Sequence, residues 1–295
     1  ADPGMARFER EVEALTLLKH PNIVTIHDCG RDQGHLFLVM DLVPGRPLDA
    51  YALHHRPNIH DTLALFIKIC DGVNAAHLRG VIHRDLKPGN ILVDDHGEPR
   101  ILDFGLAKLI TPPESKVPES PQPFDMTQPG QFIGSLPWAS PEQAQGLSDQ
   151  LDIRSDVYSL GVVLYQILTS RFPYTVSGGH SDTVNNIVNA EPATPSSHRP
   201  EIDRDLETII LKSLDKVPDR RYQSAGELAR DLRRYLAGEP IEARRDSLRY
   251  LLTKSFARHR LTAMASAAAL LAVTLGLVVS LSLWRHAERQ RKAAQ

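Results

Sequence analysis

Two polar strings restrict this chain more than any other feature of its sequence: HRDLKPGN at residues 83–90 and DFG at residues 103–105. The apolar runs ILV (91–93) and RIL (100–102) flank the turn at 94–97 and predict a short hairpin between the two strings. Each motif alone is a weak signal, because a solvated salt bridge on a loop explains it equally well. The two strings in this order form a far more specific signal than either string alone.

Four side chains of these strings have the chemistry that phosphoryl transfer needs. Asp85 can accept the proton of an incoming hydroxyl group, and Lys87 offers a positive charge to the transferred phosphate. Asn90 can turn its amide oxygen onto a Mg²⁺ ion. Asp103 supplies a carboxylate for Mg²⁺ or Mn²⁺ ions that bridge the phosphates of ATP.

On these motifs the sequence resembles the protein kinase family, in its bacterial membrane-anchored serine/threonine branch, from residue 1 to about 238. The resemblance implies an α+β, two-lobe fold. An incomplete N-lobe (1–43, with helix C, strands 4–5 and the hinge) precedes a mainly helical C-lobe (44–238). It also implies ATP-dependent phosphorylation of protein Ser/Thr hydroxyls, because tyrosine kinases of the family usually carry an Ala-Ala-Arg or Arg-Ala-Ala run after HRD, where this chain has Leu86-Lys87-Pro88.

The same resemblance implies how ATP is held. Met40 is expected at the gatekeeper position, and the hinge that binds adenine through its backbone is expected at Asp41, Leu42 and Val43. Leu92 is expected to pack beneath the adenine ring. For the apolar members of this set, an ordinary place in the core remains an alternative.

Four other residues match structural positions of the family. Glu11 is expected to pair with the lysine of the family's third strand, although a solvated helix carboxylate is the alternative. Glu142 is expected to form a buried ion pair with Arg221. Asp156 is expected to hold the backbone of the catalytic loop, a positional role and not a chemical one.

Regulation by phosphorylation is suggested by Arg84, which directly precedes Asp85. A phosphate can order a loop against an arginine, and Thr127 is the expected acceptor in the Pro-rich loop at 111–130. The segment 134–142 resembles the end of an activation segment, with Ser135 and Ser140 in place of the usual threonine and alanine.

Neither a GxGxxG motif nor a VAIK-like lysine precedes Glu11. We therefore expect the sequence to be an N-terminally truncated part of a longer chain, and residues 1–295 alone to bind ATP poorly. A pseudokinase scaffold or receptor without catalysis is the alternative, against which the intact Asp85, Asn90 and Asp103 argue. A small-molecule phosphotransferase usually has HGD instead of HRD.

A run without charged side chains extends from Leu261 to Trp284. As a helix it reaches about 36 Å, against about 30 Å for the hydrocarbon core of a bilayer. It predicts a single transmembrane helix, with a basic juxtamembrane linker at 239–260 and the start of an extracytoplasmic region at 285–295. The alternatives are a long buried helix for the run and a plain helical linker for 239–260. The kinase domain is expected on the cytoplasmic side of the cell membrane, where ATP and Mg²⁺ are found.

Composition limits the partners. The net charge of −2 gives no general attraction to nucleic acid, so we expect protein substrates with Ser/Thr acceptors and the lipid bilayer. A homodimer for autophosphorylation is a further expectation. Cys29 and Cys70 are too few for a disulfide framework.

Hydrophobic periodicity predicts the main elements. A helix is expected around Phe8, Val12 and Leu15, and strands at 23–28 and 35–40. Further helices are expected from Asp61 to about Gly80, at 155–169, at 204–215 and after Ser224, where Ser224 and Glu227 form a capping-box pattern.

Overall fold

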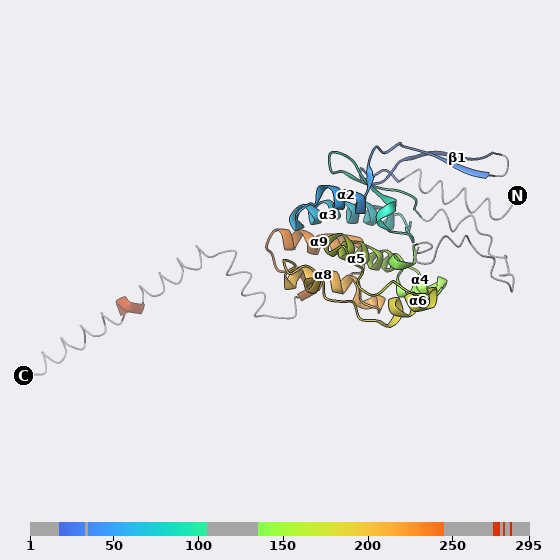
Figure 1. The fold of residues 1–295 in the computed structure, drawn as a ribbon. Helices are drawn as coiled ribbons and strands as arrows, with labels where there is room; N and C mark the ends of the chain where they lie inside the picture. The colour runs from blue at the N-terminus through green and yellow to red at the C-terminus, as the bar shows by residue number, and fades with distance from the viewer. Residues whose placement is uncertain are drawn as a thin grey trace, which may run out of the picture. The chain divides into compact units, whose positions relative to one another are not determined.

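The computed structural model describes residues 18–32, 35–104, 135–244, 274–277, 280 and 284, without the side chains of residues 31, 32, 35 and 36. The chain divides into two compact units, Ala1–Ala237 and Gly238–Gln295. The predicted N-terminal helix with Glu11, and the predicted loop 111–130 with Thr127, lie outside the described residues. Figure 1 shows the described elements, which combine small sheets with a larger set of helices.

The strands form two small antiparallel sheets. In the first, β1 (Ile26–Asp32) pairs with β2 (His35–Met40). In the second, β4 (Ile91–Val93) lies between β3 (Arg46–Pro47) and β5 (Pro99–Ile101). The hairpin predicted at 91–102 is therefore confirmed.

The first strand begins later than the sequence predicts. Residues 23 and 24 turn toward β5, because Ile23 forms a bridge with Ile101 and the N–H of Val24 donates to the carbonyl of Ile101 at 3.0 Å. This segment therefore ties the two sheets together. β1 also ends later than predicted, at Asp32, whereas β2 spans residues 35–40 as predicted.

Helices make up most of the regular secondary structure described in the larger unit. Their bounds are α2 (Leu48–His55), α3 (Ile59–His77), α4 (Pro141–Ala144), α5 (Ile153–Thr169), α6 (His180–Asn189), α7 (Pro195–His198), α8 (Arg204–Ser213) and α9 (Ala225–Leu236). Short 3-10 turns are η1 (Pro88–Asn90), η3 (Leu136–Trp138), η4 (Ser148–Gln150), η5 (Pro218–Arg220) and η6 (Glu242–Arg244). The expected α+β class with a mainly helical larger part is confirmed for the described residues.

Capping side chains explain where the helices start. The carbonyl oxygen of the Asn58 side chain accepts from the N–H of Asp61 at 2.8 Å, so α3 begins before the predicted Asp61. At α9 the Ser224 hydroxyl accepts from the N–H of Glu227 at 3.2 Å, as the capping pattern predicts. The two residues do not form a full capping box, because the Glu227 carboxylate accepts from the N–H of Gln223 and not from that of Ser224.

The sequence analysis did not predict α2 and α6, because each buries too few apolar side chains to show a clear period. In α2 the buried side chain is Leu48 alone, and in α6 the buried side chains are Thr183 and Ile187. By contrast, α5 is buried around most of its circumference, and its sequence contains the apolar run LGVVLY at residues 160–165. Propensity and periodicity detect a largely buried helix such as α5 and miss largely exposed helices such as α2 and α6.

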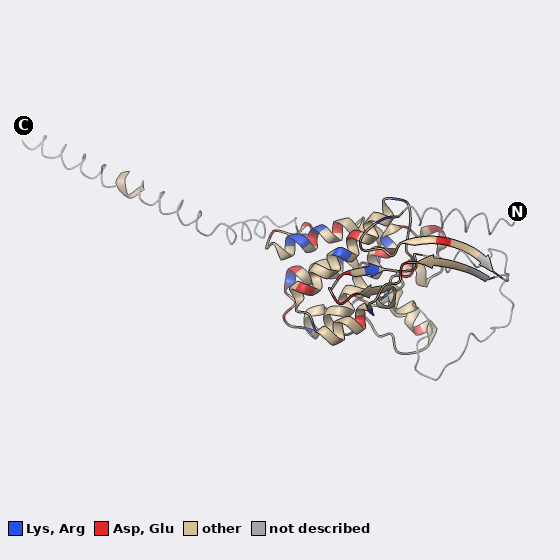
Figure 2. Ribbon diagram, turned by 90° about the horizontal axis from the view of Figure 1, so that it is seen from above, with Lys and Arg blue, Asp and Glu red and all other residues tan. Residues whose placement is uncertain are grey.

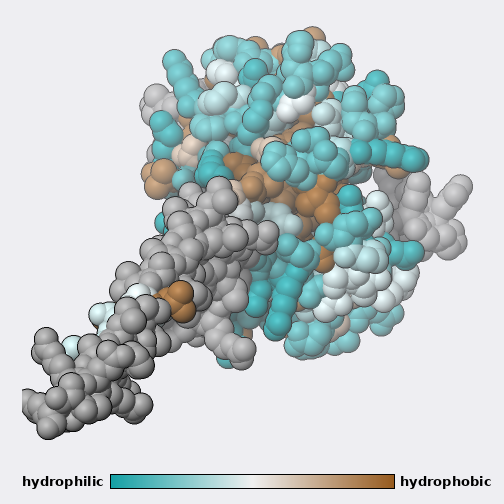
Figure 3. Space-filling model, turned by 90° about the vertical axis from the view of Figure 1, so that its left-hand side faces the viewer, coloured by the Kyte–Doolittle hydropathy of each residue, from teal (hydrophilic) through white to brown (hydrophobic). Residues whose placement is uncertain are grey.

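The core lies where α3, α5, α8 and α9 pack against one another (Figure 1). Its fully buried side chains include Leu63, Phe66, Val73, Leu160, Leu164, Leu206, Ile210, Leu228 and Leu232. Burying each large apolar side chain stabilises the fold by about 1.5–3 kcal/mol. In Figure 3 apolar residues gather in the middle of a face that is otherwise mainly hydrophilic.

Glycine at position 161 permits the close packing of α5 on α8. A Cβ atom added to Gly161 would lie 2.7 Å from the Cβ atom of Ser213, a distance that real side chains essentially never show. The centre of α5 is therefore fixed against its neighbour. This helix also carries Asp156.

Positively and negatively charged residues are both spread over the described helices (Figure 2). Cys29 and Cys70 are both free thiols. Among the described helices, none is long and apolar enough to cross a membrane. Of the run predicted to do so, only residues 274–277, 280 and 284 are described.

Candidate active site

Asp156 of α5 holds the backbone of the loop that follows α3. Its carboxylate accepts from the N–H groups of His83 at 2.7 Å and Arg84 at 2.8 Å. The same carboxylate is 2.8 Å from Nε2 of the buried His77 at the end of α3. Burial alone raises the pKa of Asp156, but the hydrogen bond from His77 and the two nearby histidine rings bring it below the ordinary value. The carboxylate therefore stays ionised beneath the loop.

His77 is a residue that the sequence analysis missed. It lies in the last turn of α3, and its side chain is only 2% exposed. The helical run predicted its position but gave no reason to pair it with a residue 79 positions away. A histidine at the buried end of a helix is the only signal that could have drawn attention to it.

Asp85 and Lys87 are in direct contact in the loop. Nζ of Lys87 lies 2.9 Å from Oδ2 of Asp85 and donates to Oγ of Ser135 at 2.6 Å. The side chain of Asp85 is 37% exposed, so one side of its carboxylate is open to an incoming group. The structure thus brings together the expected base, the expected positive charge and the segment after residue 134.

Asn90 faces the same carboxylate. Its Nδ2 donates to the backbone carbonyl of Asp85 at 2.9 Å and to Oδ2 of Asp85 at 3.1 Å. Because the N–H₂ end is committed to these acceptors, Oδ1 is directed elsewhere, and no described residue donates to it. The orientation leaves a hard oxygen ligand free.

Asp103 and Phe104 follow β5 and connect to the loop through the backbone. The N–H of Leu102 donates to the carbonyl of Asn90 at 2.9 Å. His83 joins the same segment, since its Nε2 is 2.8 Å from the carbonyl oxygen of Leu102 and its ring centroid is 4.7 Å from that of Phe104. Burial lowers the pKa of His83. The neutral ring then donates from Nε2 to the carbonyl.

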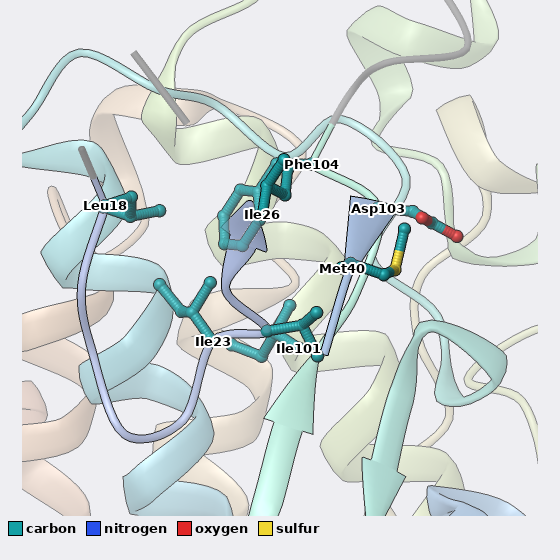
Figure 4. A pocket seen from close by; sticks show the side chains of 8 residues that line it. Leu18, Ile23, Ile26, Met40, Ile101, Asp103 and Phe104 are labelled. Atoms are coloured by element: carbon teal, nitrogen blue, oxygen red, sulfur yellow. The ribbon is translucent and has the colours of Figure 1, made fainter. Parts of the chain in front are cut away.

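The carboxylate of Asp103 is exposed, and its backbone has a φ of 52°. A left-handed non-glycine residue costs about 1–3 kcal/mol unless its surroundings hold it, and such residues cluster at functional sites. In Figure 4 the carboxylate points away from an apolar pocket between β1, β2 and β5. The pocket is lined by Leu18, Ile23, Val24, Ile26, Met40, Ile101, Asp103 and Phe104.

The donor set suits a magnesium ion held partly by a phosphate ligand. Among the described residues, no three His, Cys, Asp or Glu side chains lie close enough to bind a metal by themselves. Mg²⁺ usually takes one or two carboxylates and completes its octahedron with water and substrate phosphates. The carboxylate of Asp103 and the free Oδ1 of Asn90 fit that requirement.

The segment after β2, residues 41–43, is partly exposed to solvent. Its first residue, Asp41, donates its N–H to the carbonyl of Thr25 at 3.0 Å, and its carboxylate lies 2.7 Å from Nε2 of His27. The hydrogen bond from His27 lowers the pKa of Asp41. Leu42 is 93% exposed, and the N–H of Val43 donates to no described residue. Leu92, on β4, is half-buried.

Glu142 and Arg221 form a buried, two-pronged ion pair. Nη1 and Nη2 of Arg221 lie 2.8 and 2.9 Å from the two carboxylate oxygens of Glu142. Ser155 of α5 donates to the same carboxylate at 2.7 Å. Burial raises the pKa of Glu142, but Arg221 outweighs it and brings the pKa to about 2. The pair therefore joins α4, α5 and the segment after η5.

Arg84 lies in the same loop as Asp85, and its backbone φ of 64° is in the left-handed region. Its Nε is buried and has no hydrogen-bond partner among the described residues. The residues expected to regulate or complete the site from outside this loop, Thr127 and Glu11, lie outside the described residues. The structure thus brings together Asp85, Lys87 and Asn90 directly, and Asp103 through the backbone.

Comparison with known proteins agrees with this geometry. Residues 2–231 match the family model described as "Protein kinase domain". The chain is 37% identical over 248 residues to the serine/threonine-protein kinase PknB of Mycobacterium tuberculosis H37Rv, covering 82% of this chain and 38% of that protein.

Two further relatives have similar names. The probable serine/threonine-protein kinase SCO3848 of Streptomyces coelicolor is 36% identical over 82% of this chain and 35% of its own length. The probable serine/threonine-protein kinase PknB of Lactococcus lactis is 32% identical over 78% of this chain and 35% of its own length. The chain therefore spans a little more than a third of the length of these curated relatives.

Proposed function

Because the chain belongs to the protein kinase family, we propose that the protein containing it transfers the γ-phosphate of ATP to serine and threonine hydroxyls of other proteins. The observation that carries the proposal is that Lys87 and Asn90 both contact Asp85, in a loop whose Asn90 carbonyl accepts from Leu102, the residue before the exposed Asp103. These are the groups that the reaction needs, and the fold holds three of them in direct contact.

In this proposal Asp85 accepts the proton of the substrate hydroxyl through the open side of its carboxylate. Lys87 stabilises the negative charge of the phosphate as it moves toward that hydroxyl. Asn90, through Oδ1, and Asp103 hold Mg²⁺, or Mn²⁺ in its place. The metal, bound together with ATP, supplies charge neutralisation at the phosphates.

The adenine of ATP is assigned to the open segment after Met40. The carbonyl of Asp41 and the N–H of Val43 are backbone groups that an adenine edge can use, and Leu92 of β4 supplies an apolar surface. Glu11, which lies outside the described residues, is assigned to pair with the lysine that protein kinases carry on their third strand. Phosphorylation of Thr127 is proposed as a switch read by Arg84, whose buried Nε lacks a described partner.

The test of the function uses the full-length protein, Mg²⁺ and γ-labelled ATP. Asp85→Asn should reduce transfer to Ser and Thr by several orders of magnitude and leave nucleotide binding intact. Asp95→Asn makes the same change at an exposed turn residue for which the structure shows no side-chain hydrogen bond, so it should match the unaltered protein. Full activity in Asp85→Asn would refute the assignment of the base.

We also propose that the protein is anchored in the cell membrane by the run 261–284, with the kinase domain in the cytoplasm. The support is the absence of charged side chains over 24 residues, which is enough to span a bilayer as a helix. Fractionation of cells should place the full-length protein with the membranes, released by detergent and not by high salt. Release by salt alone would refute an integral span.

A further inference from the structure

Gln143 helps to cap the start of helix α4. It lies in α4, three residues after the buried Ser140, and the two residues form a reciprocal capping box. The backbone N–H of Gln143 donates to Oγ of Ser140 at 3.3 Å, and Oε1 of Gln143 accepts from the N–H of Ser140 at 2.9 Å. One end of the Gln143 amide is therefore fixed to the start of its own helix.

The other end of the same amide reaches the catalytic loop. Nε2 of Gln143 donates to the backbone carbonyl of Arg84 at 2.8 Å, across 59 positions of sequence. That carbonyl belongs to the peptide group that joins Arg84 to Asp85. The bond therefore acts directly on the backbone that carries the proposed base.

Arg84 needs such support, because its φ of 64° lies in the left-handed region. A non-glycine residue adopts that conformation at a cost of about 1–2 kcal/mol and keeps it only where the surroundings hold the backbone. Asp156 of α5 holds its N–H at 2.8 Å, and Gln143 of α4 holds its carbonyl at 2.8 Å. The two peptide groups of Arg84 are thus fixed from two different helices.

The segment 135–144 meets the loop at a second point. Oγ of Ser135 accepts from Nζ of Lys87, which also lies 2.9 Å from the carboxylate of Asp85. Ser135 contacts the residue two positions after Asp85, and Gln143 contacts the residue directly before it. Asp85 is therefore bracketed by two contacts from one segment.

We propose that Gln143 is a positioning residue for the kinase reaction, which couples the segment 135–144 to the Asp85 carboxylate through the Arg84 carbonyl. The inference rests on the proposed function. It assigns to this glutamine a role beyond capping: the amide is needed for its N–H₂ group, because a capping box alone needs only the oxygen. Glutamate and glutamine serve equally well as the oxygen partner in a capping box.

This difference between donor and acceptor defines the test. Gln143→Glu keeps an acceptor for the N–H of Ser140 but has no donor for Arg84, and it places a carboxylate against a carbonyl. We expect kcat to fall about 10- to 100-fold, since small misplacements of a reacting group have effects of that order. KM for ATP should change little, and Tm should fall less than in a variant that loses the cap, because the cap is preserved.

The assay measures autophosphorylation and phosphorylation of dephosphorylated casein by the full-length protein, with ATP varied to separate kcat from KM. Gln145→Glu is the matched control. It makes the same change two residues later, where the side chain is exposed and the structure shows no side-chain hydrogen bond. It should behave as the unaltered protein does.

Gln143→Lys provides the reverse case, because lysine offers a donor to the Arg84 carbonyl but no acceptor for Ser140. We expect it to keep more of kcat than Gln143→Glu while lowering Tm, and it decides the question if Gln143→Glu does not fold. Equal kcat in Gln143→Glu and the unaltered protein overturns the inference, as does a greater loss of kcat in Gln143→Lys. No transfer by the unaltered protein to either probe overturns the proposed function itself.

Discussion

The catalytic loop and the segment after β2 are held in opposite ways. Under the loop, the carboxylate of Asp156 is buried and bonded to two backbone N–H groups and a histidine. After β2, the carboxylate of Asp41 pairs with His27 at the surface, where both side chains are about half exposed, and Leu42 projects into solvent. The hydrogen bonds of Asp156 are strong because they lie in the protein interior, where the dielectric constant is low. The Asp41–His27 pair is weaker because water competes for both groups.

This contrast shows which part of the molecule sets the position of the reacting groups. Asp85, Lys87 and Asn90 follow α3 and rest on α5, so their geometry depends on the helical core. The β1–β2 hairpin and the segment after it carry few buried contacts and can move without disturbing them. Substitutions in the two regions should therefore differ in their effect even when the chemistry of the change is the same.

The largest effect is expected from Glu142→Gln. The substitution removes the negative partner of Arg221, whose side chain is fully buried. Removing one member of a buried ion pair costs about 3–5 kcal/mol, because the remaining charge has no solvent. Urea denaturation of the full-length protein should show this loss in the free energy of unfolding of the kinase domain.

The control for this prediction is Glu98→Gln. Glu98 pairs with Lys68 at 2.5 Å, but the two side chains are 47% and 41% exposed. An exposed pair contributes about 0–1 kcal/mol, so the loss should be several times smaller. Equal losses in the two variants would contradict the contrast between buried and surface pairs.

The Glu142 pair also predicts a dependence on pH. The folded protein lowers the pKa of Glu142 to about 2 from its ordinary value of 4.5. A carboxyl group with a depressed pKa stabilises the fold above its unfolded pKa, and that contribution is lost as the pH falls through the folded pKa. The difference in unfolding free energy between the unaltered protein and Glu142→Gln should therefore shrink between about pH 4.5 and pH 2.

An intermediate effect is expected from placing valine at glycines in the two regions. Gly161→Val on α5 presses against the Cβ atom of the buried Ser213, and such overpacking costs about 1–3 kcal/mol. Gly30→Val on β1 meets the ring of Phe37, which is 44% exposed and can turn into solvent. We expect a clear fall in Tm for the first variant and little change for the second. Similar shifts would mean that the hairpin is as tightly packed as the helices.

The smallest effect is expected from Asp41→Asn. The substitution weakens a surface contact with His27 that water and salt already compete with. The Tm of the kinase domain should not change measurably, and raising the salt concentration should not separate the variant from the unaltered protein. A clear loss would show that the segment after β2 depends on this ion pair.

The sequence predicted the parts of the fold that depend on local patterns. The continuous apolar face of α5 and the Ser224 cap of α9 could both be recognised from residue order. The start of β1 could not, because Ile23 and Val24 pair with β5, which lies more than seventy positions later. The short helices α2 and α6 bury too few side chains to show a period.

The candidate site divides in the same way. The motif residues Asp85, Lys87 and Asn90 are close in sequence, and their contacts follow from that proximity. The contacts of His77 with Asp156 and of Gln143 with Arg84 join distant segments through a single hydrogen bond each. The Ser140 and Gln143 pair fits a capping-box pattern that the sequence analysis did not identify, and the second partner of Gln143 is a backbone carbonyl, which has no signature in a sequence.

The anchoring of the loop by Asp156 has a consequence for the side chains above it. The carboxylate binds main-chain amides at positions 83 and 84, and every amino acid except proline provides such an amide. These two hydrogen bonds therefore make no demand of their own on the side chains at positions 83 and 84. The imidazole of residue 83 can instead pack against Phe104, with the two rings tilted, and the guanidinium group of residue 84 is left to respond to a charge brought from elsewhere in the protein.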